Sequence, residues 1–205
     1  MARRRDRMVR RLRDRVEVSD RVAAALRRVP RGEFVPDARA DRAHADRPLP
    51  IGEGQTISAP HVVALMADRL DATTGDRVLE VGTGCGYHAA VTAELVGADG
   101  VYTVERNPTL ADRAREHLAE TGYGAVSVRT ADGRVGWTEH APYDRAYLTC
   151  AAEAFPPGVR EQVRPGGIVL GPIGDRRQRL VGGRVRSDGS LDRTNHGPVR
   201  FVRLR

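Results

Sequence analysis

The chain has 205 residues and 22.4 kDa, is 40% hydrophobic and 30% charged, and holds no apolar run near the ~20 residues of a membrane-spanning helix. Cys85 and Cys150 fit neither a disulfide framework nor a zinc site, and the N-terminus lacks a signal peptide's apolar core, so we expect a cytoplasmic protein without metal or membrane partner. The net charge of +7 comes from 34 arginines and no lysine, which codon bias explains as readily as a nucleic-acid surface does.

The arginines gather at the start of the chain. Eight of the first sixteen residues are arginine, and apolar residues at helical spacing predict a helix over residues 3–17. A solvated basic helix is one interpretation, and contact with a polyanion or a membrane surface is the alternative. We expect a monomer with no obligate nucleic-acid partner.

Ser19 is placed to cap a second helix, and Pro30 ends it because proline cannot continue a helical hydrogen-bond ladder.

The rest of the chain divides into a loop region and an alternating region. Residues 31–54 are rich in proline and glycine and predict an ordered loop, whereas residues 60–70 predict a helix. Strands are predicted at 77–81, 100–105, 126–130, 145–149 and 167–173, helices at 87–96, 109–121 and 155–163, and closing strands at 180–186 and 199–204. This alternation predicts an α/β fold with a doubly wound, mostly parallel sheet and N-terminal helices.

A glycine turn follows the first predicted strand of the sheet. Gly82, Gly84 and Gly86 allow positive φ angles and a close approach of a ligand to the backbone. Dinucleotide-binding turns usually read G-x-G-x-x-G and hold a pyrophosphate, but here the third glycine comes one residue early and Glu80 precedes the turn. A carboxylate in this place suits a cationic ligand. A tight strand–helix junction without a ligand is the alternative.

Two more acidic residues follow predicted strands. Glu105 ends the second strand, where a carboxylate can accept hydrogen bonds from both ribose hydroxyls of a nucleoside. Asp132 and Gly133 follow the third strand, where the aspartate can accept from an adenine amino group. With Glu80, these residues predict an adenosine site without a phosphate partner, which S-adenosylmethionine fits. Exposed charges at strand ends are the alternative.

Short motifs cover the chain from about residue 22 to its end. They are Val29-Pro30-Arg31, Phe34-Val35-Pro36, Gln55-Thr56-Ile57-Ser58, residues 78–89, Asp132-Gly133, Gly136-Trp137, Ala141-Pro142-Tyr143-Asp144, residues 163–167 and Arg200-Phe201-Val202. Together they resemble the protein-L-isoaspartate O-methyltransferase family. The resemblance implies a Rossmann-like class I methyltransferase that uses S-adenosylmethionine and releases S-adenosyl-L-homocysteine. It also implies the substrate, the free carboxylate of L-isoaspartyl residues in damaged proteins and peptides, whose methylation starts succinimide-mediated repair.

The resemblance also assigns the site. Ser58 is the expected catalytic residue, which orients the acceptor carboxylate. The expected cofactor-binding residues are Thr56, Ile57, Ala59, His61, Glu80, Gly82, Thr83, Gly84, Gly86, Glu105, Asp132 and Gly133. Leu49, Pro50, Ile51 and Gly52 are the expected wall for the peptide. Ser58 as the N-cap of the helix at 60–70 and His61 as a structural histidine are the alternatives.

The chemistry favours a hydroxyl at the acceptor. A carboxylate is already a competent nucleophile at neutral pH, so transfer from a sulfonium needs positioning rather than a strong base. An arginine clamp would bind the anion too tightly to react.

We divide the chain into an arginine-rich helical extension, 1–18, and a methyltransferase domain, 19–205, with an acceptor-side region at 19–70 and the cofactor-binding sheet at 71–205.

Departures from the family pattern leave the acceptor open. Cys85 replaces a usual serine, Cys150 a usual alanine, and Arg203 stands where the closing strand often has proline. One rival is a relative that methylates an aspartate of a dedicated peptide. A nucleic-acid methyltransferase would carry Asp/Asn-Pro-Pro-Tyr/Phe where residues 148–151 read Leu-Thr-Cys-Ala. A non-catalytic rival is a basic nucleic-acid-binding protein built on a relic cofactor fold.

Overall fold

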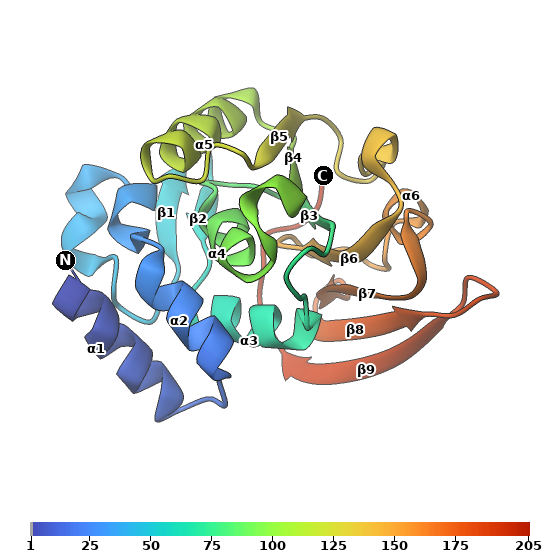
Figure 1. Cartoon of the computed structure of the whole chain (residues 1–205), viewed down its shortest axis with the longest axis horizontal. Helices are drawn as coiled ribbons and strands as arrows, with labels where there is room; N and C mark the ends of the chain where they lie inside the picture. Colours follow the sequence, from blue (N-terminus) through green and yellow to red (C-terminus); the bar gives the residue numbers. More distant parts are fainter. Residues whose placement is uncertain (1) are drawn as a thin grey trace.

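The computed structural model describes residues 2–205 and has a mostly parallel central sheet flanked by helices (Figure 1). The α-helices are α1 (Ala2–Arg13), α2 (Asp20–Arg28), α3 (Pro60–Leu70), α4 (Tyr87–Val96), α5 (Pro108–Glu120) and α6 (Pro157–Arg160). The 3-10 helices are η1 (Arg31–Phe34), η2 (Asp37–Arg42), η3 (Ala98–Gly100) and η4 (Thr138–His140). The strands are β1 (Leu49–Gly52), β2 (Gln55–Ile57), β3 (Val78–Val81), β4 (Val101–Glu105), β5 (Ser127–Thr130), β6 (Tyr143–Leu148), β7 (Val163–Ile173), β8 (Arg179–Val185) and β9 (Leu191–Pro198).

The sheet has seven strands in the order β5-β4-β3-β6-β7-β8-β9. The strands from β3 to β7 pair in parallel, whereas β8 is antiparallel to both β7 and β9. From β3 the chain builds the sheet outward through β4 and β5, and then crosses to β6 on the other side of β3. Such a switch point at the carboxyl end of a strand is where open α/β sheets bind ligands. The predicted α/β class is confirmed.

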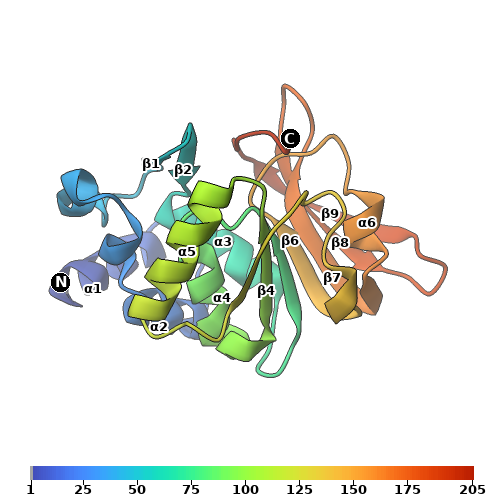
Figure 2. The same cartoon turned by 90° about the horizontal axis from the view of Figure 1, so that it is seen from above.

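The helices form unequal layers on the sheet. Figure 2 shows α3, α4 and α5 on one face and the short α6 on the other. Helix α2 packs against α3 and α4, and α1 packs on α2 with Met8, Val9 and Leu12 buried. The hairpin of β1 and β2 stands at the same edge of the molecule as the C-terminus (Figure 2). This edge is formed by the carboxyl ends of the parallel strands.

The predicted N-cap at Ser19 is confirmed, whereas the helix predicted over residues 3–17 ends earlier, with α1 stopping at Arg13. The Ser19 hydroxyl accepts a hydrogen bond from the backbone N–H of Val22 at 3.3 Å, which is the geometry of an N-cap. Helix α3 begins at Pro60, but its N-cap is Ala59, whose methyl group cannot accept a hydrogen bond. The interpretation of Ser58 as this helix's N-cap is therefore wrong, and its side chain is free for another role.

Three predicted elements need correction. The region 31–54 contains η1, η2 and the strand β1, which pairs with β2 across a two-residue turn, because glycine and proline mark hairpin ends as well as loops. The predicted strand 199–204 is wrong. Strand β9 precedes it, and residues 202–204 instead exchange backbone hydrogen bonds with Ala151. The predicted helix 155–163 shrinks to α6 because β7 already begins at Val163.

Candidate active site

A cavity of about 480 Å³ opens at the carboxyl ends of β3, β4 and β6. Its wall comes from the glycine turn after β3, the loops after β4, β5 and β6, the β1–β2 hairpin and the C-terminal segment. The lining residues are Glu53, Gln55, Thr56, Val81, Gly82, Gly84, Val104, Glu105, Arg106, Asn107, Pro108, Gly133, Thr149, Cys150, Val202, Arg203, Leu204 and Arg205. Four residues predicted from the glycine turn and the acidic strand ends, Gly82, Gly84, Glu105 and Gly133, therefore meet here.

Two glycines shape this wall because no larger residue fits. Gly82 has φ +100°, and a Cβ there would collide with Oγ1 of Thr149. That hydroxyl donates to the carbonyl oxygens of Gly82 and Val81, which holds the turn against the end of β6. A Cβ on Gly133 would collide with the side chain of Val81. The backbone of both loops thus faces the cavity at close range.

Glu105 joins two sides of the cavity. Its carboxylate accepts hydrogen bonds from the backbone N–H of Gly84 at 2.9 Å and from that of Asn107 at 3.0 Å. Each carboxylate oxygen has a further lone pair, so both can still accept from a ligand. The two backbone donors fix the carboxylate in position, as two adjacent ribose hydroxyls would require.

Glu80 lies beneath the turn and does not line the cavity. Its side chain is fully buried, and the Thr103 hydroxyl, which is 2.7 Å from that of Thr83, donates to Oε2 of Glu80 at 2.7 Å. Burial raises the pKa of Glu80 to about 8, so the carboxyl is mostly neutral at pH 7. The structure thus places Glu80 beneath the turn as its support, and Glu80 lines none of the three cavities described for this site.

Asp132 lies at the protein surface beside the cavity. Arg134 donates to it through Nη2 at 2.6 Å and through its backbone N–H at 2.9 Å. The side-chain hydrogen bonds from Arg134 lower the pKa of Asp132, which keeps this carboxylate ionised. The neighbouring Gly133 lines the cavity, but the Asp132 carboxylate does not.

A second cavity, of about 800 Å³, adjoins the first. Its lining is Pro48, Thr56, Ser58, Ala59, His61, Val62, Leu65, Thr149, Pro198, Val199, Arg200, Phe201 and Val202. Thr56, Thr149 and Val202 line both cavities. A pocket of about 40 Å³ lies between the loop carrying Ser58 and the glycine turn. The structure thus sets Ser58 beside a cavity that borders the predicted cofactor site.

Other predicted residues lie in different places. His61 lines the second cavity, with Nδ1 at 2.8 Å from Oδ1 of Asp46. Ile57 and Thr83 line the small pocket, whereas Gly86 packs against α5 and lines none of the three. The predicted peptide wall, residues 49–52, lines neither large cavity: Leu49 and Ile51 turn into the core, and Pro50 and Gly52 are exposed.

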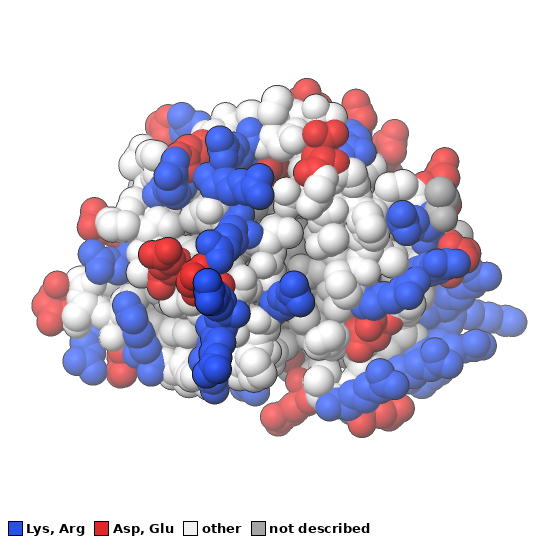
Figure 3. All heavy atoms as spheres, turned by 180° about the vertical axis from the view of Figure 1, so that it is seen from behind, with Lys and Arg blue, Asp and Glu red and all other residues white. Residues whose placement is uncertain are grey.

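Part of the wall was not predicted from the sequence. Thr149, Val202 and Leu204 had no predicted role, although Thr149 is the last residue of a predicted strand, which is the signal that would have found it. Arg203 lines the first cavity and forms an ion pair with Asp175. On the face shown in Figure 3, charged side chains of both signs surround a broad uncharged area.

The chain is similar to known proteins over nearly its whole length. Residues 3–205 match the family described as protein-L-isoaspartate(D-aspartate) O-methyltransferase (PCMT), a range that includes the arginine-rich segment. The chain is 50% identical to protein-L-isoaspartate O-methyltransferase 2 of Archaeoglobus fulgidus over 202 residues, which is 98% of this chain and 92% of that protein. It is 52% identical to the protein-L-isoaspartate O-methyltransferase of Methanopyrus kandleri over 204 residues, 98% of this chain and 90% of that protein.

Solved structures give the same comparison. A structure titled protein-L-isoaspartate O-methyltransferase superposes with a TM-score of 0.88 at 29% identity, covering 97% of this chain and 65% of that chain. A putative protein-L-isoaspartate O-methyltransferase of Plasmodium falciparum, solved in complex with S-adenosyl-L-homocysteine, superposes with a TM-score of 0.85 at 22% identity and covers 98% of both chains. The second likeness shows a shared fold.

Proposed function

The chain belongs to the protein-L-isoaspartate(D-aspartate) O-methyltransferase family, and on that premise we propose that it methylates the free carboxylate of L-isoaspartyl residues in damaged proteins and peptides. The methyl donor is S-adenosylmethionine, and S-adenosyl-L-homocysteine is the second product. Methylation makes the carboxylate a better leaving group, so that a succinimide closes spontaneously. Hydrolysis of the succinimide returns part of the residues to normal aspartate.

One observation carries this proposal in the structure: the two large cavities meet at Thr56 and Thr149. A transfer between two bound molecules needs two adjacent sites with a common boundary. Ser58 lines one of them and Glu105 the other. Holding donor and acceptor in line in this way lowers the barrier by about 7–11 kcal/mol in well-oriented systems.

The residues of the first cavity fit S-adenosylmethionine. Its volume of about 480 Å³ is typical of a small-molecule site. Gly82 and Gly133 line it with backbone alone, because a Cβ at either position would collide with the side chain of Thr149 or Val81, and Glu105 offers two fixed acceptor oxygens for a ribose. When bound, the cofactor supplies an electrophilic methyl group on a sulfonium.

The residues of the second cavity suit a carboxylate acceptor. The Ser58 hydroxyl can donate one hydrogen bond to the anion, which orients it without neutralising it. Val62, Leu65 and Phe201 are apolar and limit the water that would otherwise solvate the nucleophile. The chain therefore binds, orients and partly dehydrates a group that is already reactive.

Radiolabelled methyl transfer to a matched pair of peptides tests the proposal. One peptide carries L-isoaspartate and the other L-aspartate at the same position. We expect label only in the isoaspartyl peptide, and it should be labile to base as methyl esters are. Label only in the aspartyl peptide would favour the relative that modifies a dedicated peptide, and label in neither would contradict the substrate.

We further propose a cytoplasmic monomer that needs no nucleic acid, with the boundary at residue 18 between extension and domain. Among residues 2–205, no helix has both the length and the apolar character to cross a membrane. Two arginines close to the N-terminus are paired with acids, Arg13 with Asp20 at 2.6 Å and Arg27 with Asp6 at 3.6 Å, which supports a solvated role for α1. Gel filtration and a titration with DNA at two salt concentrations test these statements.

A further inference from the structure

Arg31 lies beneath the loop that carries Ser58 and is completely buried. Its Nη2 donates to the carbonyl oxygen of Ser58 at 2.8 Å, and its Nε donates to that of Ala43 at 2.8 Å. Its Cζ lies 4.7 Å from the ring centroid of Tyr87, the first residue of α4 after the glycine turn. One side chain therefore joins the acceptor loop, the end of η2 and the helix that follows the cofactor turn.

The charge of Arg31 has no direct counter-ion among the described residues. Its hydrogen bonds go to backbone carbonyls, its Nη1 has no partner in residues 2–205, and no ion pair there includes it. Burial lowers the pKa of Arg31, yet a guanidinium stays protonated at neutral pH. A buried, uncompensated positive charge costs folding free energy, so its position next to the acceptor loop calls for an explanation.

The hydrogen bond to Ser58 also sets the direction of a peptide group. In a planar trans peptide the C=O and the following N–H point to opposite sides. Because the Ser58 carbonyl points to Arg31, the N–H of Ala59 points away from it. Within residues 2–205 that N–H makes no hydrogen bond, and both Ser58 and Ala59 line the second cavity.

Building on the proposed function, we propose that Arg31 is a positioning residue for methyl transfer. It holds the Ser58–Ala59 peptide so that the Ser58 hydroxyl and the Ala59 N–H address the same acceptor carboxylate. It also places a positive charge behind that peptide, where it favours the ionised acceptor without touching it. A direct guanidinium clamp would stabilise the ground state as much as the transition state, and the intervening peptide avoids this.

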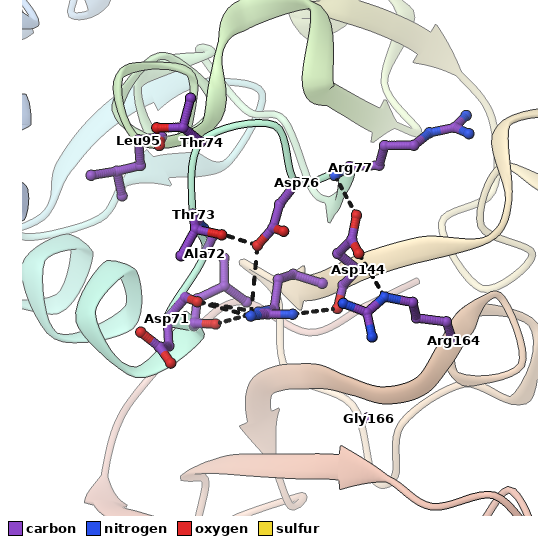
Figure 4. Close-up of polar contacts among 12 residues, drawn as sticks. Asp71, Ala72, Thr73, Thr74, Asp76, Arg77, Leu95, Asp144, Arg164 and Gly166 are labelled. Atoms are coloured by element: carbon purple, nitrogen blue, oxygen red, sulfur yellow. Dashed lines mark hydrogen bonds and ion pairs between the residues drawn. The ribbon is translucent and has the colours of Figure 1, made fainter.

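The chain offers a matched control in Arg145. Its side chain is 11% exposed and donates to the carbonyl oxygens of Leu70, Asp71 and Asp144, each at 3.0 Å. Figure 4 labels two of these acceptors, Asp71 and Asp144, and draws the hydrogen bonds to them as dashed lines. Arg145 lies at the start of β6, the opposite end of the sheet from the cavities. Arg145 also pairs with Asp76 at 3.6 Å, whereas Arg31 has no such counter-ion among residues 2–205. Both arginines donate to backbone carbonyls, and only Arg31 lies under the acceptor loop.

The experiment compares Arg31→Met and Arg31→Lys with Arg145→Met and Arg145→Lys in full-length enzyme. Turnover of the isoaspartyl peptide is measured well below each variant's melting midpoint, and calorimetry with S-adenosyl-L-homocysteine reports on the first cavity. We expect Arg31→Met to lower kcat about 100-fold, which is the effect of a misplaced reacting group. Its affinity for S-adenosyl-L-homocysteine should be unchanged. Both Arg145 variants should melt earlier but keep the wild-type kcat.

The pH profile of kcat separates the charge from the support. Without the positive charge, the bound acceptor carboxylate protonates more readily, so the acid limb of the Arg31→Met profile should move to higher pH. The other charged or titratable side chains at this cavity, His61 with its partner Asp46 and Arg200, are the same in wild type and variant, so the shift reports on Arg31. Arg31→Lys keeps the charge but lacks the planar fork, so its kcat should fall while its acid limb stays in place. If Arg31 were purely structural, the acid limb would stay in place in both variants.

A kcat of Arg31→Met within threefold of that of Arg145→Met would overturn the inference, as would an unmoved acid limb. If Arg31→Met does not fold, Arg31→Lys decides: wild-type kcat in that variant contradicts positioning by the fork. Failure of the proposed function would look different, because the wild-type enzyme itself would then leave the isoaspartyl peptide unlabelled.

Discussion

The Glu105 carboxylate accepts a hydrogen bond from the backbone N–H of Gly84 at 2.9 Å, across the space between the ends of β3 and β4. Its other oxygen accepts from Asn107 at 3.0 Å. This places a carboxylate with free lone pairs in the wall of the first cavity before any ligand arrives. The arrangement makes the cofactor site sensitive to a single side chain.

Replacing Glu105 with alanine should weaken cofactor binding. Two charge-assisted hydrogen bonds to ribose hydroxyls are lost, which at about 1.5–3 kcal/mol each raises Kd at least about 100-fold. Titration calorimetry with S-adenosyl-L-homocysteine measures this. The Glu105→Gln variant keeps one acceptor oxygen, so its Kd should lie between those of wild type and Glu105→Ala. A Glu105→Ala variant with the wild-type Kd would contradict the assignment.

Two serines allow a contrast between turnover and stability. Ser58 lines the acceptor cavity and does not cap α3, whereas Ser19 caps α2. Ser58→Ala should therefore lower kcat and leave both the melting midpoint and the cofactor affinity unchanged. Ser19→Ala should lose about 0.5–2 kcal/mol of unfolding free energy and keep its kcat. A Ser58→Ala variant whose only defect is thermal instability would refute the acceptor role.

Two glycines with similar backbone angles separate steric collision from conformational strain. Gly82 has φ +100° and Gly75 has φ +88°, but a Cβ would meet Thr149 at the first position and nothing within 4 Å at the second. Gly75→Ala should cost about 1–2 kcal/mol of stability and preserve cofactor binding. Gly82→Ala should in addition displace the turn and raise the Kd for S-adenosyl-L-homocysteine. Equal behaviour of the two variants would mean that the contact with Thr149 does not shape the site.

The buried Glu80 predicts how stability depends on pH. Burial raises its pKa from the usual 4.5 of a glutamate to about 8, so the folded protein binds more protons than the unfolded chain between these pH values. The unfolding free energy should therefore fall as pH rises through this window, by at most about 1.4 kcal/mol per pH unit. Denaturant titrations of wild type and Glu80→Gln measure it, and the variant's curve should lack this component. Parallel curves would show that Glu80 titrates normally.

The sequence allowed good prediction where local pattern and tertiary role agree. The strand, turn and helix around Gly82 and the cap at Ser19 follow from glycine spacing and capping chemistry, which act over a few residues. Strand β9 escaped prediction because it is a mostly exposed edge strand without apolar alternation. Residues 199–204 are rich in apolar residues, yet they cross the ends of the strands, and no local signal distinguishes that course from a sheet edge.

The same limit applies to the site. Gly82, Glu105 and Gly133 could be predicted because they lie at or just after the ends of predicted strands, and parallel strands bring their carboxyl ends together. Glu80 was placed at the ligand because the sequence shows its charge but not its depth; in the structure it is buried beneath the turn. The contribution of Arg31 depends on a contact 27 positions along the chain, which only the folded structure reveals.

Thr56, Thr149 and Val202 form the wall that the two cavities share. A ligand that shifts any of them on one side changes what the other ligand meets, so the two occupancies are thermodynamically linked. Linkage is reciprocal: the factor by which cofactor changes peptide affinity equals the factor by which peptide changes cofactor affinity. The shared wall thereby makes the affinity for either ligand depend on whether the other is bound.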